Sequence, residues 1–128
     1  MTNRRGIGVA KILIVDDEKM ICEEFRDLLQ EENHQVDVAM GGEEAIRKVK
    51  ETQYDLVFLD VLMPKLEGRQ VFEEIKKVSR VPVAIMSGYI PPNKEKEVLA
   101  LGAVACLKKP LDLSRVKSIV QSVAAKRK

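Results

Sequence analysis

Five polar residues that could do chemistry stand where apolar runs of the sequence end. Asp16 and Asp17 follow one run directly, and Asp60 follows another. Ser87 comes after a third run, and Lys109 stands just beyond a fourth. Carboxylate oxygens suit a hard ion such as Mg²⁺, a carboxylate can act as a nucleophile toward phosphorus, and hydroxyl and ammonium groups can contact phosphoryl oxygens. Together these residue types indicate phosphoryl transfer to an aspartate with the help of Mg²⁺.

Three carboxylates placed close together repel one another, and this repulsion favours a bound cation. Two like unit charges 4 Å apart repel by about 4 kcal/mol at an effective dielectric constant of 20. Either the carboxyl pKa values rise or a cation lies between the groups. Each residue alone is a weak indicator, because an aspartate after a strand is often only the N-cap of the next helix. The interpretation depends on their joint placement at the ends of separate strands.

The apolar runs predict the strands that would position these residues. Four of the five runs are continuous, which is typical of strands buried on both faces of a parallel sheet. Asp37 interrupts the second run and predicts a half-exposed edge strand. The runs cover residues 12–15, 36–39, 56–59, 83–86 and 104–107.

Helical periodicity fills the segments between the runs. Gly102 follows the fourth helical stripe, as a helix C-cap would. His34, at the end of the first stripe, is expected to be an ordinary polar residue at a helix end. Apolar residues recur at helical spacing within residues 21–29, 45–49, 71–78, 98–101 and 113–123.

The alternation of strands and helices predicts an α/β fold. We expect the flavodoxin-like (βα)5 class, a doubly wound five-stranded parallel sheet in strand order 2-1-3-4-5. The first and third strands are neighbours in that order. Asp16, Asp17 and Asp60 should therefore converge at one edge of the sheet, where such folds bind ligands.

Length, charge and composition limit the class of protein. The 128 residues fit one domain, expected over residues 11–125, with a flexible tail at residues 1–10 and a basic end at residues 126–128. The net charge of +2 is too small to indicate nucleic-acid binding, and no run reaches the roughly 20 apolar residues of a membrane span. The start of the chain lacks the apolar core of a signal peptide, so we expect a cytoplasmic protein. Cys22 and Cys106 form no CxxC pattern and are expected to be small buried residues in a reducing compartment.

With these residues in place, the sequence resembles the receiver domain of bacterial two-component response regulators, over about residues 11–125. The motifs that carry the resemblance occur in the family's order and are highly specific in combination. They are the strand and acidic pair Ile12–Glu18, the segment Asp55–Pro64 with Gly68 after it, the pair Ser87-Gly88, and Gly102-Ala103 followed by Lys109-Pro110.

The resemblance implies a metal site. Asp17 and Asp60 would bind Mg²⁺ directly, together with the backbone carbonyl of Leu62. Asp16 would act mainly through a metal-bound water. Mg²⁺ is thus the cofactor that the resemblance implies.

The resemblance also implies a phosphoryl site and partners. Asp60 would accept the phosphoryl group from a sensor histidine kinase or a histidine phosphotransfer protein. Lys109 would contact the group, Ser87 would respond to it, and Lys108 would be a surface residue. Phosphorylation would switch a signalling surface for a partner or output domain, with no direct nucleic-acid or membrane binding by this domain. No enzyme activity is expected beyond Mg²⁺-dependent self-phosphorylation and autodephosphorylation.

The fifth strand departs from the family's pattern. The family usually carries a tyrosine or phenylalanine at the position of Cys106. That ring normally moves when the hydroxyl residue moves, whereas a thiol is too small to fill or vacate such a slot. We therefore expect switching through Ser87 and its neighbours Gly88 and Tyr89, with little change at Cys106.

The segment after Tyr89 departs from the pattern as well. Pro91 and Pro92 stand where the family often begins its fourth helix, and a proline keeps the residue before it extended. The sequence predicts a short fourth helix that begins near Asn93.

Three other interpretations fit the residues less well. A haloacid-dehalogenase-like phosphohydrolase places its nucleophile after the first strand in a DxD motif, but here Asp16 is followed two residues later by Glu18. A flavodoxin needs a Ser/Thr-Gly phosphate loop after the first strand, and the sequence has none there. A receiver-shaped docking module would not need the intact five-residue site.

Overall fold

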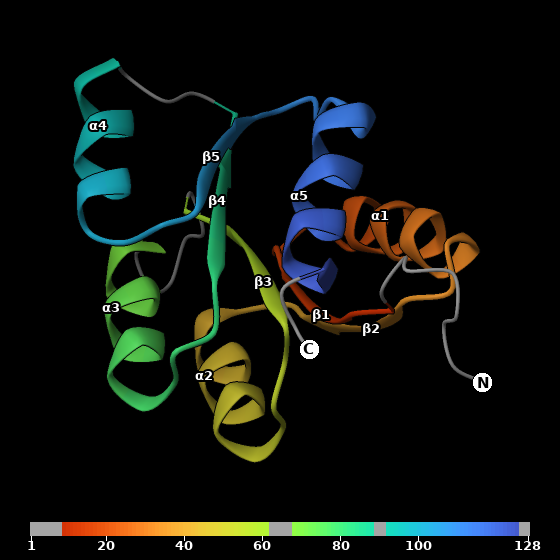
Figure 1. Cartoon of the computed structure of the whole chain (residues 1–128). Helices are drawn as coiled ribbons and strands as arrows, with labels where there is room; N and C mark the ends of the chain where they lie inside the picture. Colours follow the sequence, from red (N-terminus) through yellow and green to blue (C-terminus); the bar gives the residue numbers. More distant parts are fainter. Residues whose placement is uncertain (1–8, 62–67, 89–91, 126–128) are drawn as a thin grey trace.

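Strands and helices alternate along the chain, as the computed structural model shows (Figure 1). The structure describes residues 9–61, 68–88 and 92–125, so the tail and the basic end expected at the two ends of the chain remain predictions. In chain order the elements are β1 (Lys11–Val15), α1 (Lys19–Glu31), β2 (Gln35–Ala39), α2 (Gly42–Glu51), β3 (Leu56–Asp60), α3 (Gly68–Val78), β4 (Val83–Ser87), α4 (Pro92–Ala100), β5 (Ala105–Lys108) and α5 (Leu113–Ala125).

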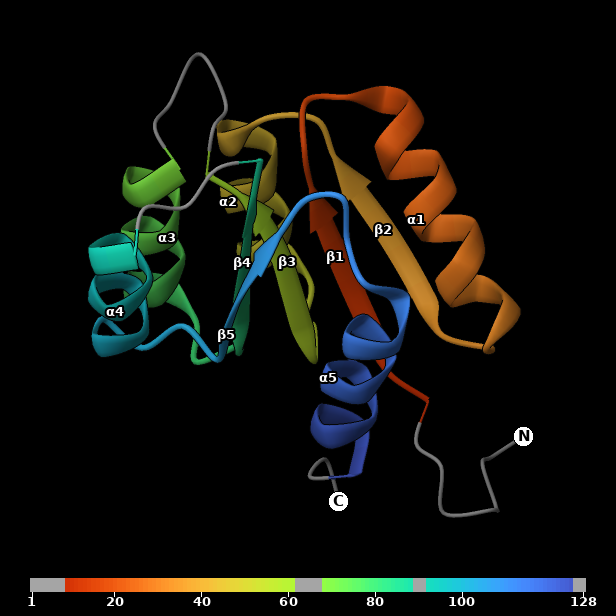
Figure 2. The same cartoon turned by 90° about the horizontal axis from the view of Figure 1, so that it is seen from above.

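The strands form one parallel sheet in the order β2-β1-β3-β4-β5 (Figure 2). Ile14 of β1 lies opposite Phe58 of β3, and Asp60 at the end of β3 lies opposite Met86 of β4. This order confirms the predicted flavodoxin-like (βα)5 fold. Since β1 and β3 are neighbours, their carboxyl ends meet at one edge of the sheet.

Burial explains why the continuous apolar runs form strands. Every residue of β3 and β4 is buried, and so are the last four residues of β1. A parallel strand covered on both faces needs apolar residues throughout. β2 lies at the edge, and its residues Val36, Asp37 and Val38 are only half-buried, which confirms the predicted edge strand.

The last strand begins one residue later than its apolar run predicts. The run starts at Val104, but β5 starts at Ala105, and 50% of Val104 is exposed to solvent. The backbone N–H of Val104 still donates to the carbonyl of Val83 at 2.9 Å. Because β5 is the edge strand opposite β2, the start of this strand is open to solvent, and an apolar residue there need not be buried.

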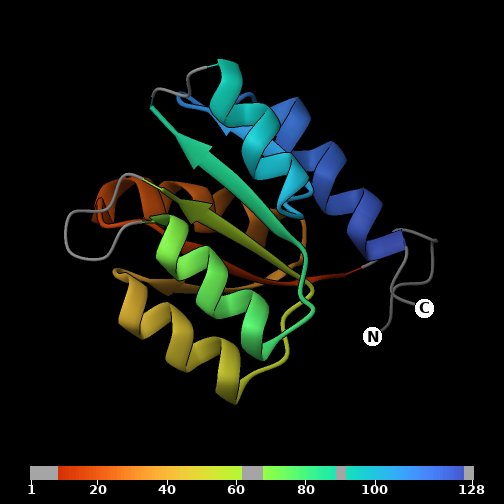
Figure 3. The same cartoon turned by 90° about the vertical axis from the view of Figure 1, so that its left-hand side faces the viewer.

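Helices cover both faces of the sheet (Figures 2 and 3). One apolar cluster joins α1 and α5 to the sheet and contains the rings of Phe25 and Phe58, whose centroids are 4.8 Å apart. A second cluster joins α2 and α3 to the other face, with Val98 of α4 packed against it. None of the helices within the described ranges is long and apolar enough to span a membrane.

The α4 helix is short, as predicted, and begins one residue before Asn93. Gly102 follows it with a φ of +111°, in the left-handed region that favours glycine. The N–H of Gly102 donates to the carbonyl of Leu99 at 3.0 Å, and that of Ala103 donates to Val98 at 3.1 Å. These bonds end the helix in the way that the sequence indicates and lead the chain into β5.

His34 does more than the sequence suggests. It lies beyond the end of α1 and is buried, with 7% of its surface exposed. Its Nδ1 accepts a hydrogen bond from the N–H of Ala10 at 3.0 Å. Burial lowers the pKa of His34, although Glu32 acts in the opposite direction. The ring therefore fastens the chain before β1 to the turn before β2.

Candidate functional site

The acidic pair lies at the carboxyl end of β1. Asp16 is fully buried, and its N–H donates to the carbonyl of Ala39 at 3.1 Å. Its Oδ1 accepts from the N–H of Glu18 at 3.0 Å, and its carbonyl accepts from Cys22 Sγ at 3.3 Å. Asp17 is exposed to solvent. The pair thus combines one carboxylate held firmly inside the fold with one that faces outward.

Asp60 is the last residue of β3 and is 4% exposed. The strand extends one residue further than its apolar run predicts, and β4 extends in the same way to include Ser87. The N–H of Val61 donates to the carbonyl of Met86 at 3.1 Å, which continues the ladder between the two strands. The sheet itself therefore fixes the backbone of Asp60.

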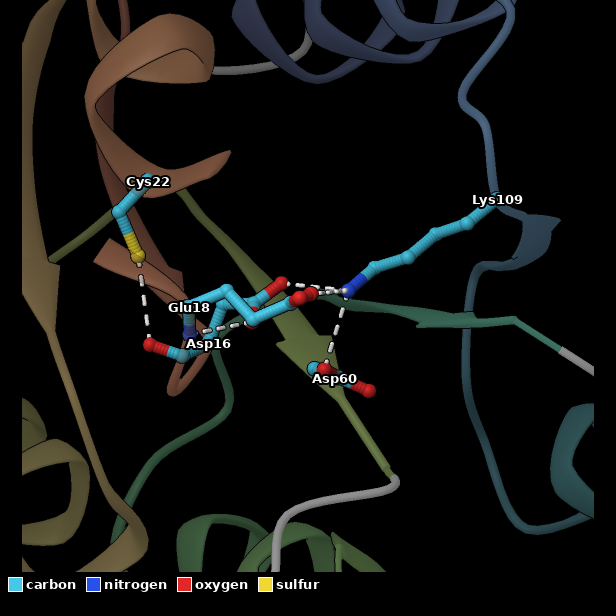
Figure 4. Close-up of polar contacts among 5 residues, drawn as sticks. All are labelled: Asp16, Glu18, Cys22, Asp60 and Lys109. Atoms are coloured by element: carbon cyan, nitrogen blue, oxygen red, sulfur yellow. Dashed lines mark hydrogen bonds and ion pairs between the residues drawn. The ribbon is translucent and has the colours of Figure 1, made fainter. Parts of the chain in front are cut away.

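Lys109 reaches from the end of β5 to the carboxylates (Figure 4). Its Nζ donates to Asp16 Oδ2 at 2.6 Å and to Asp60 Oδ2 at 3.1 Å. It also forms an ion pair with Glu18 Oε1 at 3.6 Å. The lysine side chain is 15% exposed, so its bonds to Asp16 and Asp60 lie largely out of water, whereas Glu18 is 59% exposed. Figure 4 shows the ammonium between Asp16 and Glu18 on one side and Asp60 on the other.

Burial and charge shift the pKa values in this group. Burial raises the pKa of the Asp16 carboxyl, and the Asp60 charge raises it too, while hydrogen bonds from Lys109 and Glu18 act against this. Burial alone would lower the pKa of Lys109, but its hydrogen bonds with Asp16 and Asp60 outweigh burial and raise it. Lys109 is therefore a positive charge at neutral pH, whereas the fold disfavours the ionised form of Asp16.

The three predicted acidic ligands converge. Asp16, Asp17 and Asp60 each offer a carboxylate oxygen, and these oxygens lie within 4.8 Å of one another. Three carboxylates exceed the single charge of Lys109, and the Asp60 charge adds to burial in raising the pKa of Asp16. Oxygen donors with excess negative charge fit a hard divalent cation such as Mg²⁺. The fourth predicted ligand, the carbonyl of Leu62, lies outside the described residues.

Ser87 ends β4 beside this group and is fully buried. Its carbonyl accepts a hydrogen bond from the N–H of Lys109 at 2.8 Å. Among the described residues, no atom lies within 4 Å of a Cβ added to Gly88, so they leave space open beside Ser87 on that side. Tyr89, also predicted for the switch, lies outside the described residues. Lys108 is exposed, as expected.

Cys106 is a packed core residue. It is 5% exposed and belongs to the apolar cluster on the α2–α3 face, opposite Ile85 of β4. Burial raises the pKa of its thiol, as does the charge of Glu95. The thiol thus stays protonated inside the fold.

Sequence reasoning missed two contacts of the site. Glu18 reaches Lys109 with its side chain, and Cys22 donates its thiol hydrogen to Asp16. The position of Glu18 directly after the acidic pair was the available signal. For Cys22, the only signal was its position in the first turn of a helix. Burial and the nearby Asp16 charge raise the pKa of its thiol to about 11.

Comparisons with known proteins agree with this geometry. Residues 12–121 match the family described as the response regulator receiver domain. The transcriptional regulatory protein CpxR homolog of Haemophilus influenzae is 39% identical over 121 residues, which are 91% of this chain and 53% of that protein. The transcriptional regulatory protein ZraR of Salmonella typhimurium is 33% identical over 119 residues, which are 92% of this chain and 27% of that protein. The chain thus spans about half, or less, of these curated relatives.

Solved structures share the fold as well. The receiver domain of the Francisella response regulator 1452 has a TM-score of 0.86 at 27% identity, over 93% of this chain and 99% of that one. A two-component response regulator from Clostridium difficile has a TM-score of 0.85 at 29% identity, over 91% of this chain and 96% of that one.

Proposed function

Because the chain belongs to the response regulator receiver domain family, whose role is that of phosphoacceptor in two-component signalling, we propose that Asp60 is its phosphoacceptor. One observation carries the assignment. The ammonium of Lys109 lies 3.1 Å from Asp60 Oδ2, and Asp16 and Asp17 place two more carboxylates within reach of a shared cation. Asp16 is also buried beside Lys109, but it follows β1, whereas Asp60 is itself the last residue of a buried strand.

The acidic group supports Mg²⁺ as the cofactor. Asp17 and Asp60 would hold the ion directly with the carbonyl of Leu62, and Asp16 would act through a bound water. When bound, the ion supplies positive charge against the phosphoryl oxygens. The buried backbone bonds of Asp16 keep its carboxylate in place for this role.

The phosphoryl transfer itself needs positioning more than covalent help from the protein. A carboxylate oxygen of Asp60 forms a bond to phosphorus while the bond from phosphorus to the donor's histidine nitrogen breaks, and the nitrogen keeps the electron pair. Lys109 contacts a phosphoryl oxygen with an N–H that now points to Asp60. The donor is a sensor histidine kinase or a histidine phosphotransfer protein.

The switch runs from Ser87 to α4. The Ser87 hydroxyl moves toward the phosphoryl group and draws Gly88 and Tyr89 with it. The open space beside Gly88 allows this movement, while Cys106, packed in the core, takes little part. The change alters a signalling surface for a partner or an output domain.

The chain acts in signalling rather than as an enzyme with turnover. Self-phosphorylation and autodephosphorylation, both Mg²⁺-dependent, are the reactions that its residues support. The relatives bear the names of transcriptional regulators, which supports an output in transcription through another part of the protein. Two free, buried cysteines favour a reducing compartment, so we place the chain in the cytoplasm.

The test is stoichiometric labelling. Phosphoramidate with Mg²⁺ should add one phosphoryl group to the wild type, read by intact mass, and none to Asp60→Asn. Equal labelling of both proteins would remove Asp60 from the site. Repeated turnover of a small phosphate ester would instead favour a phosphohydrolase.

A further inference from the structure

Glu18 is an anionic partner of Lys109 that the phosphoacceptor and metal roles leave unused. Its Oε1 lies 3.6 Å from Lys109 Nζ, and its side chain is 59% exposed, against 0% for Asp16 and 6% for Asp60. It does not belong to the three-carboxylate group found among the described residues. Glu18 therefore contacts Lys109 from the solvent side.

The fold directs the Glu18 side chain to this contact. Glu18 is the N-cap residue of α1, yet its side chain makes no capping hydrogen bond. Its backbone is held on both sides: the N–H donates to Asp16 Oδ1 at 3.0 Å, and the carbonyl accepts from the N–H of Cys22 at 3.1 Å. Because the backbone of Glu18 is held in place and its side chain does not cap α1, its carboxylate is available to Lys109.

The geometry of an ammonium group explains how the contact between Glu18 and Lys109 could affect Asp60. Lysine has three N–H donors, and here three carboxylates surround them (Figure 4). The ammonium donates one hydrogen bond to Asp16 and one to Asp60, and the Glu18 carboxylate attracts it from the solvent side at 3.6 Å. The N–H that points to Asp60 is the one that can meet a phosphoryl oxygen on Asp60.

We propose that Glu18 is a positioning residue for phosphoryl transfer, orienting the Lys109 ammonium toward Asp60. The proposal rests on the function proposed above and goes beyond it. An exposed ion pair contributes at most about 1 kcal/mol, so loss of the contact should slow phosphorylation on the order of two- to fivefold. A purely electrostatic influence of Glu18 has the opposite sign, because removing a negative charge favours the approach of an anionic donor.

Two substitutions of Glu18 separate contact from charge. Glu18→Asp keeps the charge, but its carboxylate is one methylene too short to reach Lys109 from the same backbone position. Glu18→Gln removes the charge. Glu24→Gln removes one charge from an exposed position on the same helix and is the matched control. Rates of labelling by phosphoramidate at saturating Mg²⁺, together with Mg²⁺ affinity from calorimetry, are measured for all four proteins.

The proposal expects labelling two- to fivefold slower in both Glu18 variants and unchanged in Glu24→Gln. It expects Glu18→Asp to bind Mg²⁺ as tightly as the wild type, so that the slower rate cannot come from a weaker metal site. A wild-type rate in Glu18→Asp, or a faster rate in Glu18→Gln, overturns it. A wild type that takes no label, or an Asp60→Asn variant that does, would overturn the proposed function instead, and this inference with it.

Discussion

The two ends of the sheet use polar groups in opposite ways. At the carboxyl ends of the strands, the carboxylates of Asp16, Glu18 and Asp60 lie around the ammonium of Lys109, and burial raises the pKa of Asp16. At the amino ends, polar groups meet in complementary pairs. Asp55 Oδ2 accepts from the N–H of Lys11 at 2.8 Å, while the N–H of Asp55 donates to the Lys11 carbonyl at 2.7 Å. His34 accepts from Ala10 in the same region.

This contrast separates the polar residues that stabilise the fold from those that bind ligands. A satisfied hydrogen bond adds a net stabilisation of about 1 kcal/mol, whereas like charges held together lower stability. The amino end therefore contributes to folding and the carboxyl end to binding. A substitution at one end should leave the property of the other end almost unchanged.

The largest expected effect is at the carboxyl end. Asp17→Ala should weaken Mg²⁺ binding by at least about 100-fold, because it removes a direct carboxylate ligand from the group of three. Lys109→Ala should leave binding largely intact, since a protonated lysine cannot ligate a cation. Tyrosine fluorescence titrated with Mg²⁺ measures both.

Stability supplies the control for this pair. Asp17 is exposed, so without Mg²⁺ the free energy of unfolding of Asp17→Ala should stay within about 0.5 kcal/mol of the wild type. Mg²⁺ should stabilise the wild type and Lys109→Ala but not Asp17→Ala. Loss of binding in a folded Lys109→Ala would contradict the ligand scheme.

The next effect belongs to the amino end. Asp55→Ala leaves the part-buried N–H of Lys11 without its carboxylate acceptor and should lower the free energy of unfolding by about 1–3 kcal/mol. Urea unfolding measures the loss. Asp55→Asn keeps an acceptor oxygen and should retain most of the stability.

The loss of stability in Asp55→Ala should not change phosphorylation of the folded protein. Asp55→Ala should take label at Asp60 at the wild-type rate under conditions where it is folded. A labelling rate that falls with stability would show that the two ends are coupled, and the contrast between them would not hold.

Much of this contrast was predictable from the sequence. Continuous apolar runs indicate buried parallel strands, and the resulting topology brings Asp16, Asp17 and Asp60 together without any knowledge of side-chain detail. Contacts that depend on side-chain reach were not predictable. The bond between His34 and Ala10 joins residues 24 positions apart, and no periodicity reports it. The exposed start of β5 was not predictable either, because residue type does not show how far a helix covers an edge strand.

A smaller effect concerns pH at the amino end. The fold lowers the pKa of His34 below its ordinary value of about 6.5, so the unfolded chain binds a proton more readily than the folded one. The contribution of His34 to the free energy of unfolding is fully present above about pH 6.5. It falls as the pH drops below that value, by at most about 1.4 kcal/mol per pH unit.

His34→Asn is the matched variant, since its amide oxygen can accept from Ala10 at any pH. Urea unfolding at pH 7.5 and 5.5 should show a larger loss in the wild type than in the variant. Equal losses would mean that other groups carry the acid dependence and that His34 is a passive part of the amino end.

The smallest expected effect is the conformational change that phosphorylation at the carboxyl end transmits to α4. The carbonyl of Ser87 accepts from the N–H of Lys109 at 2.8 Å, and its neighbour Met86 accepts from Val61, so the end of β4 is tied to both adjacent strands. Beyond Ser87 the space beside Gly88 is open. Cys106 lies instead in a closed apolar cluster, where an empty slot for a ring would cost several kcal/mol. We therefore expect movement toward α4 rather than through β5.

Hydrogen exchange on the phosphorylated form should show this path. We expect changed protection over residues 92–100 and little change over residues 105–107, because α4 follows the Ser87 segment while the core around Cys106 stays packed. Tyr89→Ala is the decisive variant, since Tyr89 stands two residues beyond Ser87 and just before the two prolines that lead into α4. It should take label normally and lose the change in α4. If Tyr89→Ala responds to phosphorylation just as the wild type does, the signal leaves the carboxyl end by another route.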